Sequence, residues 1–148
     1  MYGITTIGRL VVHCAYRANQ KSPLPKGAKM IIEAILLGTM TATSYRATPP
    51  QTRPECKNNH ECVTSIGENV SELGVAVSPD LLAAGRVHYR DVLFIDKVGY
   101  RIIDDVMAAK NHNAIDVFVY EKWEEKKFGV RHLRVWLLPK MKIAAREK

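Results

Sequence analysis

Short runs of β-branched and aromatic residues recur along the chain, and they constrain the fold more than any other feature of the sequence. Such side chains suit the pleated, half-buried surface of a β-strand. Only residues 80–84 and 121–128, which lie between these runs, have helical character. The sequence therefore predicts a mainly β fold, a small barrel of short strands rather than a parallel α/β sheet. The predicted strands span residues 39–45, 74–77, 92–95, 100–103, 115–120 and 130–138.

The segments between these strands carry turn and cap signals. Residues 96–99 end in a glycine, which favours a hairpin between the strands on either side. Ser78 followed by Pro79 is typical of a helix N-cap and first helical position, and Gly129 ends the second helical stretch. Residues 47–59 contain three prolines and are predicted to form a loop.

Positive charge is concentrated near the N-terminus. The net charge is +7 over 148 residues, a length that supports one core. Residues 1–60 carry eight Lys and Arg against two Asp and Glu, whereas residues 61–148 carry fourteen against thirteen. We therefore predict a basic N-terminal extension over residues 1–38, one domain over residues 39–139 and a basic C-terminal tail over residues 140–148.

The sequence of the N-terminal extension leaves its role open. A basic segment attracts nucleic acid, anionic lipid or acidic cell-wall polymers, and it can equally be a solvated arm that contacts neighbouring subunits. One short strand is predicted at residues 9–15. Lys26 and Lys29 before apolar residues 30–38 resemble the start of a signal peptide, but Glu33 interrupts the apolar part and no clear cleavage site follows. This run is far shorter than the about 20 residues that cross a bilayer, so no membrane span is expected.

The cysteines allow two interpretations. Cys56 and Cys62 are close enough in sequence to close a loop as a disulfide in an oxidising compartment. Alternatively, they bind a metal together with His60 and a further ligand. Zinc sites normally show four well-spaced ligands, and the sequence has no second pair, so we predict no metal and no cofactor. Cys14 has no partner in either interpretation, and the sequence does not decide between an oxidising and a reducing compartment.

Six short motifs occur in an order that resembles the 3D domain family, which is named for three aspartates. The resemblance covers residues 39–138. The family is similar to the catalytic domain of lytic transglycosylase A and to the stationary-phase survival proteins of Gram-positive bacteria. It implies a six-stranded double-psi β-barrel, which agrees with the strand pattern. The motifs lie at residues 41–45, 64–67, 74–79, 104–105, 115–118 and 128–129.

The resemblance also implies a set of site residues. Asp105 and Asp116 are eleven positions apart, the separation expected of the family's second and third aspartates. Asp116 is the implied catalytic acid and base, and Asp105 the carboxylate that supports it. Lys110 lies in the loop between them, where the family often has a basic residue. Together with Thr64 and Tyr45 from the earlier motifs, it is expected to bind substrate.

The sequence departs from the family pattern at two places. Ser78 occupies the position of the first family aspartate, and its simplest role is to cap a helix. Residues 106–108 are Val-Met-Ala where the family has Thr-Gly-Gly. Without the resemblance, Asp104, Asp105 and Lys110 would be interpreted as structural residues that cap a turn or pair with a neighbour. A relative without catalytic activity is therefore a real alternative.

The chemistry implied by the resemblance is cleavage of peptidoglycan glycan strands by a lytic transglycosylase. Glycosidic cleavage needs a proton for the leaving oxygen and stabilisation of an oxocarbenium-like transition state, and carboxyl groups supply both. Partial burial and the neighbouring Asp105 would raise the pKa of Asp116 as such an acid requires. Small members of the family also occur in bacteriophages. The expected place of action is the bacterial cell wall, for a bacterial or a phage protein alike.

The rival hypothesis is a structural protein of a virion or envelope assembly, in which the extension contacts other subunits. The absent carboxylate at position 78 favours it. Nucleic-acid binding is a weaker third option because the sequence has neither clustered aromatic residues nor a recognition motif. Trp123 and Trp136 are expected to be core or edge aromatics, although an exposed tryptophan beside a groove would suit stacking on sugar rings. His112, in the loop between the aspartates, is expected to be a surface residue.

Overall fold

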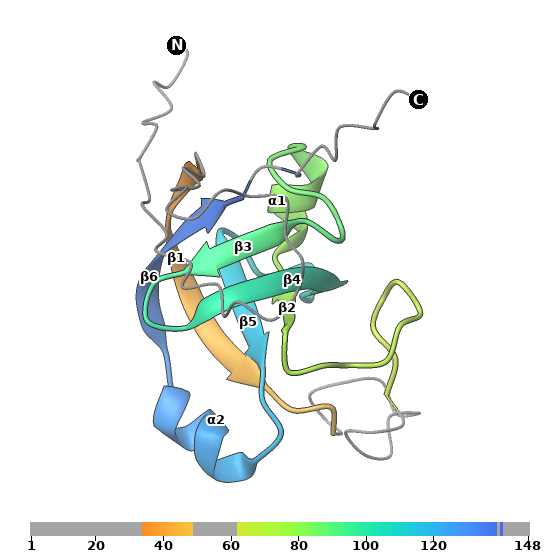
Figure 1. Cartoon of the computed structure of the whole chain (residues 1–148). Coiled ribbons are helices and arrows are strands. Elements are labelled where there is room, and N and C mark those ends of the chain that lie inside the picture. Colours follow the sequence, from red (N-terminus) through yellow and green to blue (C-terminus); the bar gives the residue numbers. More distant parts are fainter. Residues whose placement is uncertain (1–33, 49–61, 139, 141–148) are drawn as a thin grey trace, which may run out of the picture.

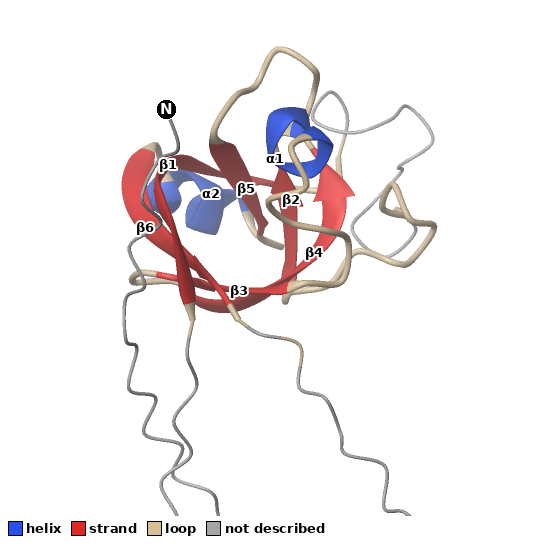
Figure 2. Cartoon of the chain, turned by 90° about the horizontal axis from the view of Figure 1, so that it is seen from above, coloured by secondary structure: helices blue, strands red, loops and turns tan. Residues whose placement is uncertain are grey.

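The computed structural model describes residues 34–48, 62–138 and 140 of the chain. Within these residues six strands form a closed barrel with the strand order β1-β5-β2-β4-β3-β6 (Figures 1 and 2). Two short helices lie outside the barrel wall. The predicted fold class, a mainly β six-stranded barrel with short helices, is confirmed. The elements are β1 (Ile35–Tyr45), β2 (Gly74–Val77), α1 (Pro79–Ala83), β3 (Val92–Ile95), β4 (Gly99–Val106), β5 (Ala114–Phe118), α2 (Lys122–Phe128) and β6 (Arg131–Leu137).

Parallel and antiparallel pairs are mixed around the barrel. β1 pairs with β5 and β2 with β4 in parallel, and the other four neighbouring pairs are antiparallel. Parallel pairs require crossover connections, so strands distant in sequence lie side by side. The predicted hairpin is confirmed as the β3–β4 pair, where Gly99 takes a φ of +97° that favours glycine. The two helices lie at opposite ends of the barrel (Figure 1).

Two apolar clusters lie on opposite faces of the barrel wall. The interior is filled by aliphatic side chains such as Val75 and Val77 of β2 and Val117 of β5. Successive residues of a strand point to opposite faces. The alternate residues Ala76 and Phe118 therefore belong to a second cluster on the outer face. That cluster consists of Tyr45, Ala47, Cys62, Val70, Ala76 and Phe118.

Two strands are longer than predicted. β1 begins at Ile35, so its first residues fall within the segment assigned to the N-terminal extension, before the expected domain start at residue 39. A register shift between Leu36 and Gly38 interrupts the regular alternation there. β4 continues to Val106 and includes both Asp104 and Asp105, because it stays paired with β2 up to that point.

Several predictions concern residues outside those described. They are the strand at residues 9–15, most of the loop at residues 47–59, His60, and Cys56 as a disulfide partner. Cys62 itself is disulfide-bonded. Within the described ranges, neither helix has the length and apolar character to cross a membrane.

Candidate functional site

Asp105 and Asp116 lie on the outer face of the barrel, on either side of Ala76. Ala76 of β2 pairs with Asp116 of β5 on one side and with Asp105 of β4 on the other. Neighbouring strands are about 4.8 Å apart, so the two aspartate α-carbons lie roughly 10 Å from each other. The side chain that separates them in this row of three strands is the buried methyl group of Ala76.

Asp116 is a partly buried carboxyl group held by one hydroxyl. Thr43, its register partner on β1, donates a hydrogen bond from Oγ1 to Asp116 Oδ1 at 2.8 Å. Burial raises the pKa of Asp116 to about 6, against the opposing effect of the Thr43 hydrogen bond. The nearby carboxylates of Glu125 and Asp105 add to the increase. At this pKa the group can donate or accept a proton near neutral pH.

Backbone amides fix the carboxylate of Asp105. Its Oδ1 accepts hydrogen bonds from the amide of Val106 at 2.8 Å and from the amide of Ser65 at 3.1 Å. Ser65 belongs to a turn closed by a bridge between Val63 and Asn69. The turn thus holds Asp105 in place from outside the barrel wall.

Asp104 adds a third carboxyl group to this face. In a regular strand Asp104 and Asp105 would point to opposite faces, but the β2–β4 register shifts between Val75 and Ala76, and both face outward. Asp104 packs over Gly74, where an added Cβ would lie 2.4 Å from Asp104 Oδ2. Burial, followed by the charge of Asp105, raises the pKa of Asp104 to about 7. The sequence interpretation missed this residue because the register shift has no local signal.

Tyr45 lies among all three aspartates. Its side chain is 7% exposed, and its hydroxyl has no hydrogen-bond partner among the described residues. Burial and then the charges of Asp105, Asp104 and Asp116 raise its pKa, so the phenol stays neutral. A neutral phenol is a hydrogen-bond donor to a carboxylate or to a ligand oxygen. Its ring packs edge-on against Phe118 at 5.6 Å between centroids.

The other predicted binding residues lie in different surroundings. Thr64 is buried in the turn beside Asp105, and its hydroxyl has no partner within the described part of the chain. Lys110 is exposed in the loop between β4 and β5 and forms no ion pair with a described residue. His112, in the same loop, is exposed as expected. Trp123 is exposed on α2, whereas Trp136 packs against Phe94 on the barrel wall.

Ser78 has a structural role that differs from the predicted one. It occupies the N-cap position of α1, but its side chain makes no cap hydrogen bond. Instead, Ser78 Oγ accepts a hydrogen bond from the amide of Ala114 at 3.0 Å and connects the end of β2 to the start of β5. It also hydrogen-bonds the carboxylate of Asp80 and thereby lowers the pKa of that group. The third carboxyl group of the outer face is therefore not at position 78 but at Asp104.

Removing the Thr43 hydroxyl tests how far its hydrogen bond lowers the pKa of Asp116. We expect Thr43→Val to raise the pKa of Asp116 by about 1, because the variant loses a hydrogen bond to the charged form. The pKa is measured by NMR titration of the Asp116 carboxyl carbon. Thr41→Val, two residues earlier on the same face of β1, is the matched control and leaves the titration unchanged. An equal pKa in the Thr43 variant and the parent would contradict the assigned hydrogen bond.

Within the described residues no group of three or more His, Cys, Asp or Glu side chains is arranged to hold a metal ion. The carboxyl groups of the three aspartates can transfer protons and stabilise positive charge. No model of a known protein family matches the chain, and no curated protein sequence matches it either.

Proposed function

We propose that this chain cleaves the glycan strands of peptidoglycan at the bacterial cell wall, by the lytic transglycosylase reaction. One observation carries the proposal: Asp116, with a pKa raised to about 6, lies across Ala76 from the amide-bound carboxylate of Asp105. The six-stranded barrel with two parallel strand pairs is compatible with the 3D domain, and the resemblance of the motifs supplies the substrate class.

In the proposed reaction Asp116 acts first as an acid and then as a base. Its protonated carboxyl group donates a proton to the glycosidic oxygen as the bond to the sugar C1 breaks. The carboxylate that remains takes the proton of the muramyl 6-hydroxyl as that oxygen bonds to C1. The product is a 1,6-anhydro sugar, and no water is consumed. Asp116 ends the cycle protonated, as it began.

Asp105 and Tyr45 have supporting parts in this mechanism. Positive charge develops on the sugar ring in the oxocarbenium-like transition state, and a fixed carboxylate nearby stabilises it. The amides of Ser65 and Val106 hold Asp105 for this purpose. The hydroxyl of Tyr45, with no partner among the described residues, can donate to a substrate oxygen or to either carboxylate.

The identity of the products tests the function. The purified chain is incubated with peptidoglycan sacculi, and the soluble fraction is analysed by mass spectrometry. We expect 1,6-anhydromuropeptides, whose mass is lower by one water than that of the hydrolysis products. Reducing-end muropeptides would keep the substrate but replace the mechanism with hydrolysis. No soluble product from folded protein on several wall types would overturn the proposal.

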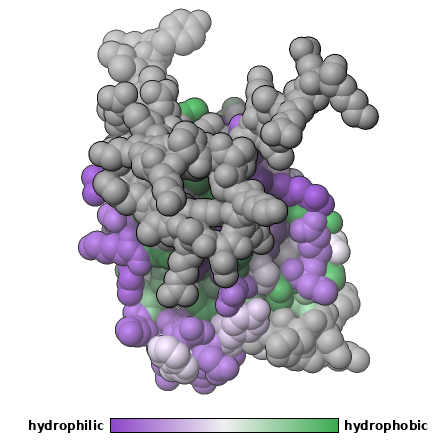
Figure 3. Space-filling model, viewed as in Figure 1, coloured by the Kyte–Doolittle hydropathy of each residue, from purple (hydrophilic) through white to green (hydrophobic). Residues whose placement is uncertain are grey.

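A structural protein of an assembly is the second candidate, and the outer face of β3 and β4 favours it. Phe94 and Tyr100 pack edge-on at 5.2 Å on this face, and Tyr100 and Ile102 are 40% and 39% exposed. Apolar residues show beside hydrophilic ones in the space-filling view of the molecule (Figure 3). An exposed tyrosine beside a half-buried phenylalanine and an exposed isoleucine suits contact with another subunit. This candidate replaces the first if sacculi release nothing.

A further inference from the structure

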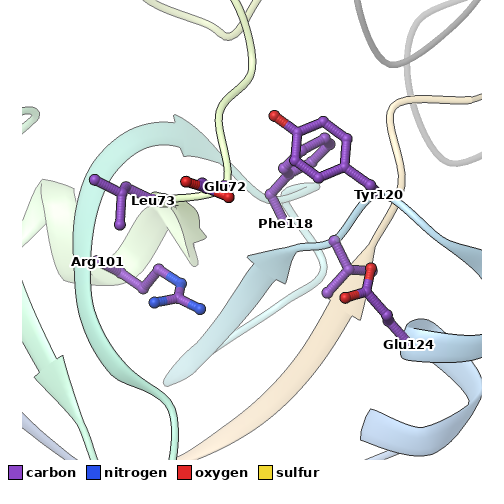
Figure 4. A pocket seen from close by; sticks show the side chains of 7 residues that line it. Glu72, Leu73, Arg101, Phe118, Tyr120 and Glu124 are labelled. Carbon is purple, nitrogen blue, oxygen red and sulfur yellow. The ribbon is translucent and has the colours of Figure 1, made fainter.

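A second polar site lies beside the aspartates, in a pocket between the segment before β2, the start of β4, the end of β5 and α2. Its volume is about 270 Å³, just below the roughly 300–1,000 Å³ of pockets for drug-sized ligands. A ligand of amino-acid size therefore suits it. Figure 4 shows charged and aromatic side chains around this space. The lining residues are Glu72, Leu73, Arg101, Phe118, Val119, Tyr120 and Glu124.

Arg101 supplies the positive charge of the pocket. It pairs with Leu93 in the β3–β4 register, and its Nη1 donates to the carbonyl oxygen of Tyr100 at 2.7 Å. Its Nε is buried and has no hydrogen-bond partner among the described residues. A buried guanidinium N–H without an acceptor is costly, and a ligand carboxylate can satisfy it with two parallel hydrogen bonds. Burial lowers the pKa of Arg101, but an arginine side chain stays charged in proteins.

Two glutamates supply negative charge in the same pocket. Glu72 lies close enough for its charge to favour the charged form of Arg101, yet no ion pair joins Arg101 to Glu72 or Glu124 within the described ranges. Glu124 is held at the start of α2, where its Oε2 accepts a hydrogen bond from the amide of Glu121 at 2.9 Å. The pocket therefore presents one cation and two anions, and within the described residues no ion pair joins the cation to either anion.

We propose that this pocket binds the end of a short peptide that carries a free carboxylate and a free amine. The carboxylate pairs with Arg101, and the ammonium group lies between Glu72 and Glu124. The apolar surface of Leu73 and Phe118 contacts the carbon atoms between them. A ligand with only one of these charges leaves the opposite charges of the pocket unpaired.

The position of the pocket connects it to the proposed reaction. Phe118 lines the pocket and also packs against Tyr45 of the aspartate face. Glycan strands of peptidoglycan carry short peptides with free amines and carboxylates. The pocket would thus hold the peptide of the strand whose glycan lies at Asp116. This assignment of the ligand rests on the proposed function.

Binding of a defined peptide tests the pocket directly. The probe is the tripeptide L-alanyl-γ-D-glutamyl-meso-diaminopimelate, added to the full chain and followed by calorimetry. We expect Arg101→Gln to weaken binding at least tenfold, whereas Arg134→Gln, an exposed arginine on β6, leaves it unchanged. On the parent chain, N-acetylation of the peptide amines is expected to weaken binding to a similar degree, and this arm needs no variant to fold. Equal affinity for the native and acetylated peptides, or for parent and Arg101→Gln, would overturn the proposal.

A cleavage comparison separates this proposal from the function on which it rests. The substrates are glycan strands with their peptides and the same strands after removal of the peptides by an amidase. We expect the parent to cleave the peptide-bearing strands at least tenfold faster, and Arg101→Gln to lose that preference. Equal rates on both substrates would reject the pocket and keep the function. Arg101-dependent binding of the tripeptide without any cleavage would keep the pocket as a peptide site and reject the function.

Discussion

Asp116→Asn is expected to lower the rate of glycan cleavage roughly 100- to 10,000-fold, the usual contribution of a general acid and base. An asparagine has the shape of the aspartate and can still accept the hydrogen bond from Thr43, but its amide has no acidic proton to transfer to the glycosidic oxygen. The variant therefore keeps its fold and loses the reaction. The measurement is the initial rate of anhydromuropeptide release from sacculi, together with a thermal melt of each protein.

Asp96→Asn is the matched control for this variant. Asp96 lies after β3, and β3 is three strands from β5 around the barrel. Its carboxylate pairs with Arg134 at 3.6 Å, so the substitution removes an equal charge from a different surface. We expect the control to keep the parent rate. Asp116→Asn with a rate within tenfold of the parent would exclude Asp116 as the acid.

The second large effect concerns the pH dependence of stability. The folded-state pKa values of Asp104 and Asp116 are about 7 and about 6, above the about 3.9 of an aspartate in an unfolded chain. Between these values the folded state binds more protons than the unfolded state. Their contribution to stability is complete below about pH 4 and is lost as the pH rises through the folded-state values. We expect the free energy of unfolding to fall by on the order of 3 kcal/mol between pH 4.5 and pH 8.

The Asp104→Asn variant tests whether Asp104 causes this loss of stability at higher pH. The variant has no charge to bury, so its free energy of unfolding is expected to vary much less with pH and to exceed that of the parent at pH 8. Urea unfolding curves at several pH values measure both quantities. Asp91→Asn, a buried aspartate that pairs with Lys140 at 3.4 Å, serves as a comparison that retains the Asp104 slope. A parent chain with constant or rising stability over this range would contradict the buried, uncharged state of Asp104.

The fold could be predicted from sequence where local signals and burial agree. β2 has the predicted bounds, Gly74–Val77, because its four buried residues begin with a glycine and are followed directly by Ser78-Pro79. The β3–β4 hairpin follows from two apolar strands and a glycine turn. The start of β1 at Ile35 could not be predicted. Its register shift near Gly38 breaks the alternation, and its pairing with β6 is a contact between the two ends of the domain.

The site could be predicted only in part, for a related reason. The resemblance to the 3D domain implied Asp105 and Asp116 through their spacing, and in the structure the two residues lie on either side of Ala76. The outward turn of Asp104 depends on the register between β2 and β4, a contact between segments far apart in sequence. The raised pKa values of Asp104 and Asp116 depend on burial, which exists only after the outer cluster has packed. A local motif predicts neither the outward orientation of Asp104 nor these pKa values.

The hydrogen bond between Thr43 and Asp116 links residues 73 positions apart in the chain. The parallel pairing of β1 with β5 that creates it forms only when distant segments have met, a slow and late type of event in folding. A fragment or a partly folded intermediate without this strand pair therefore lacks the hydrogen bond from Thr43 to Asp116. If the chain has the proposed activity, we expect that activity to appear together with closure of the barrel, and under denaturant activity and tertiary structure to be lost along one cooperative curve.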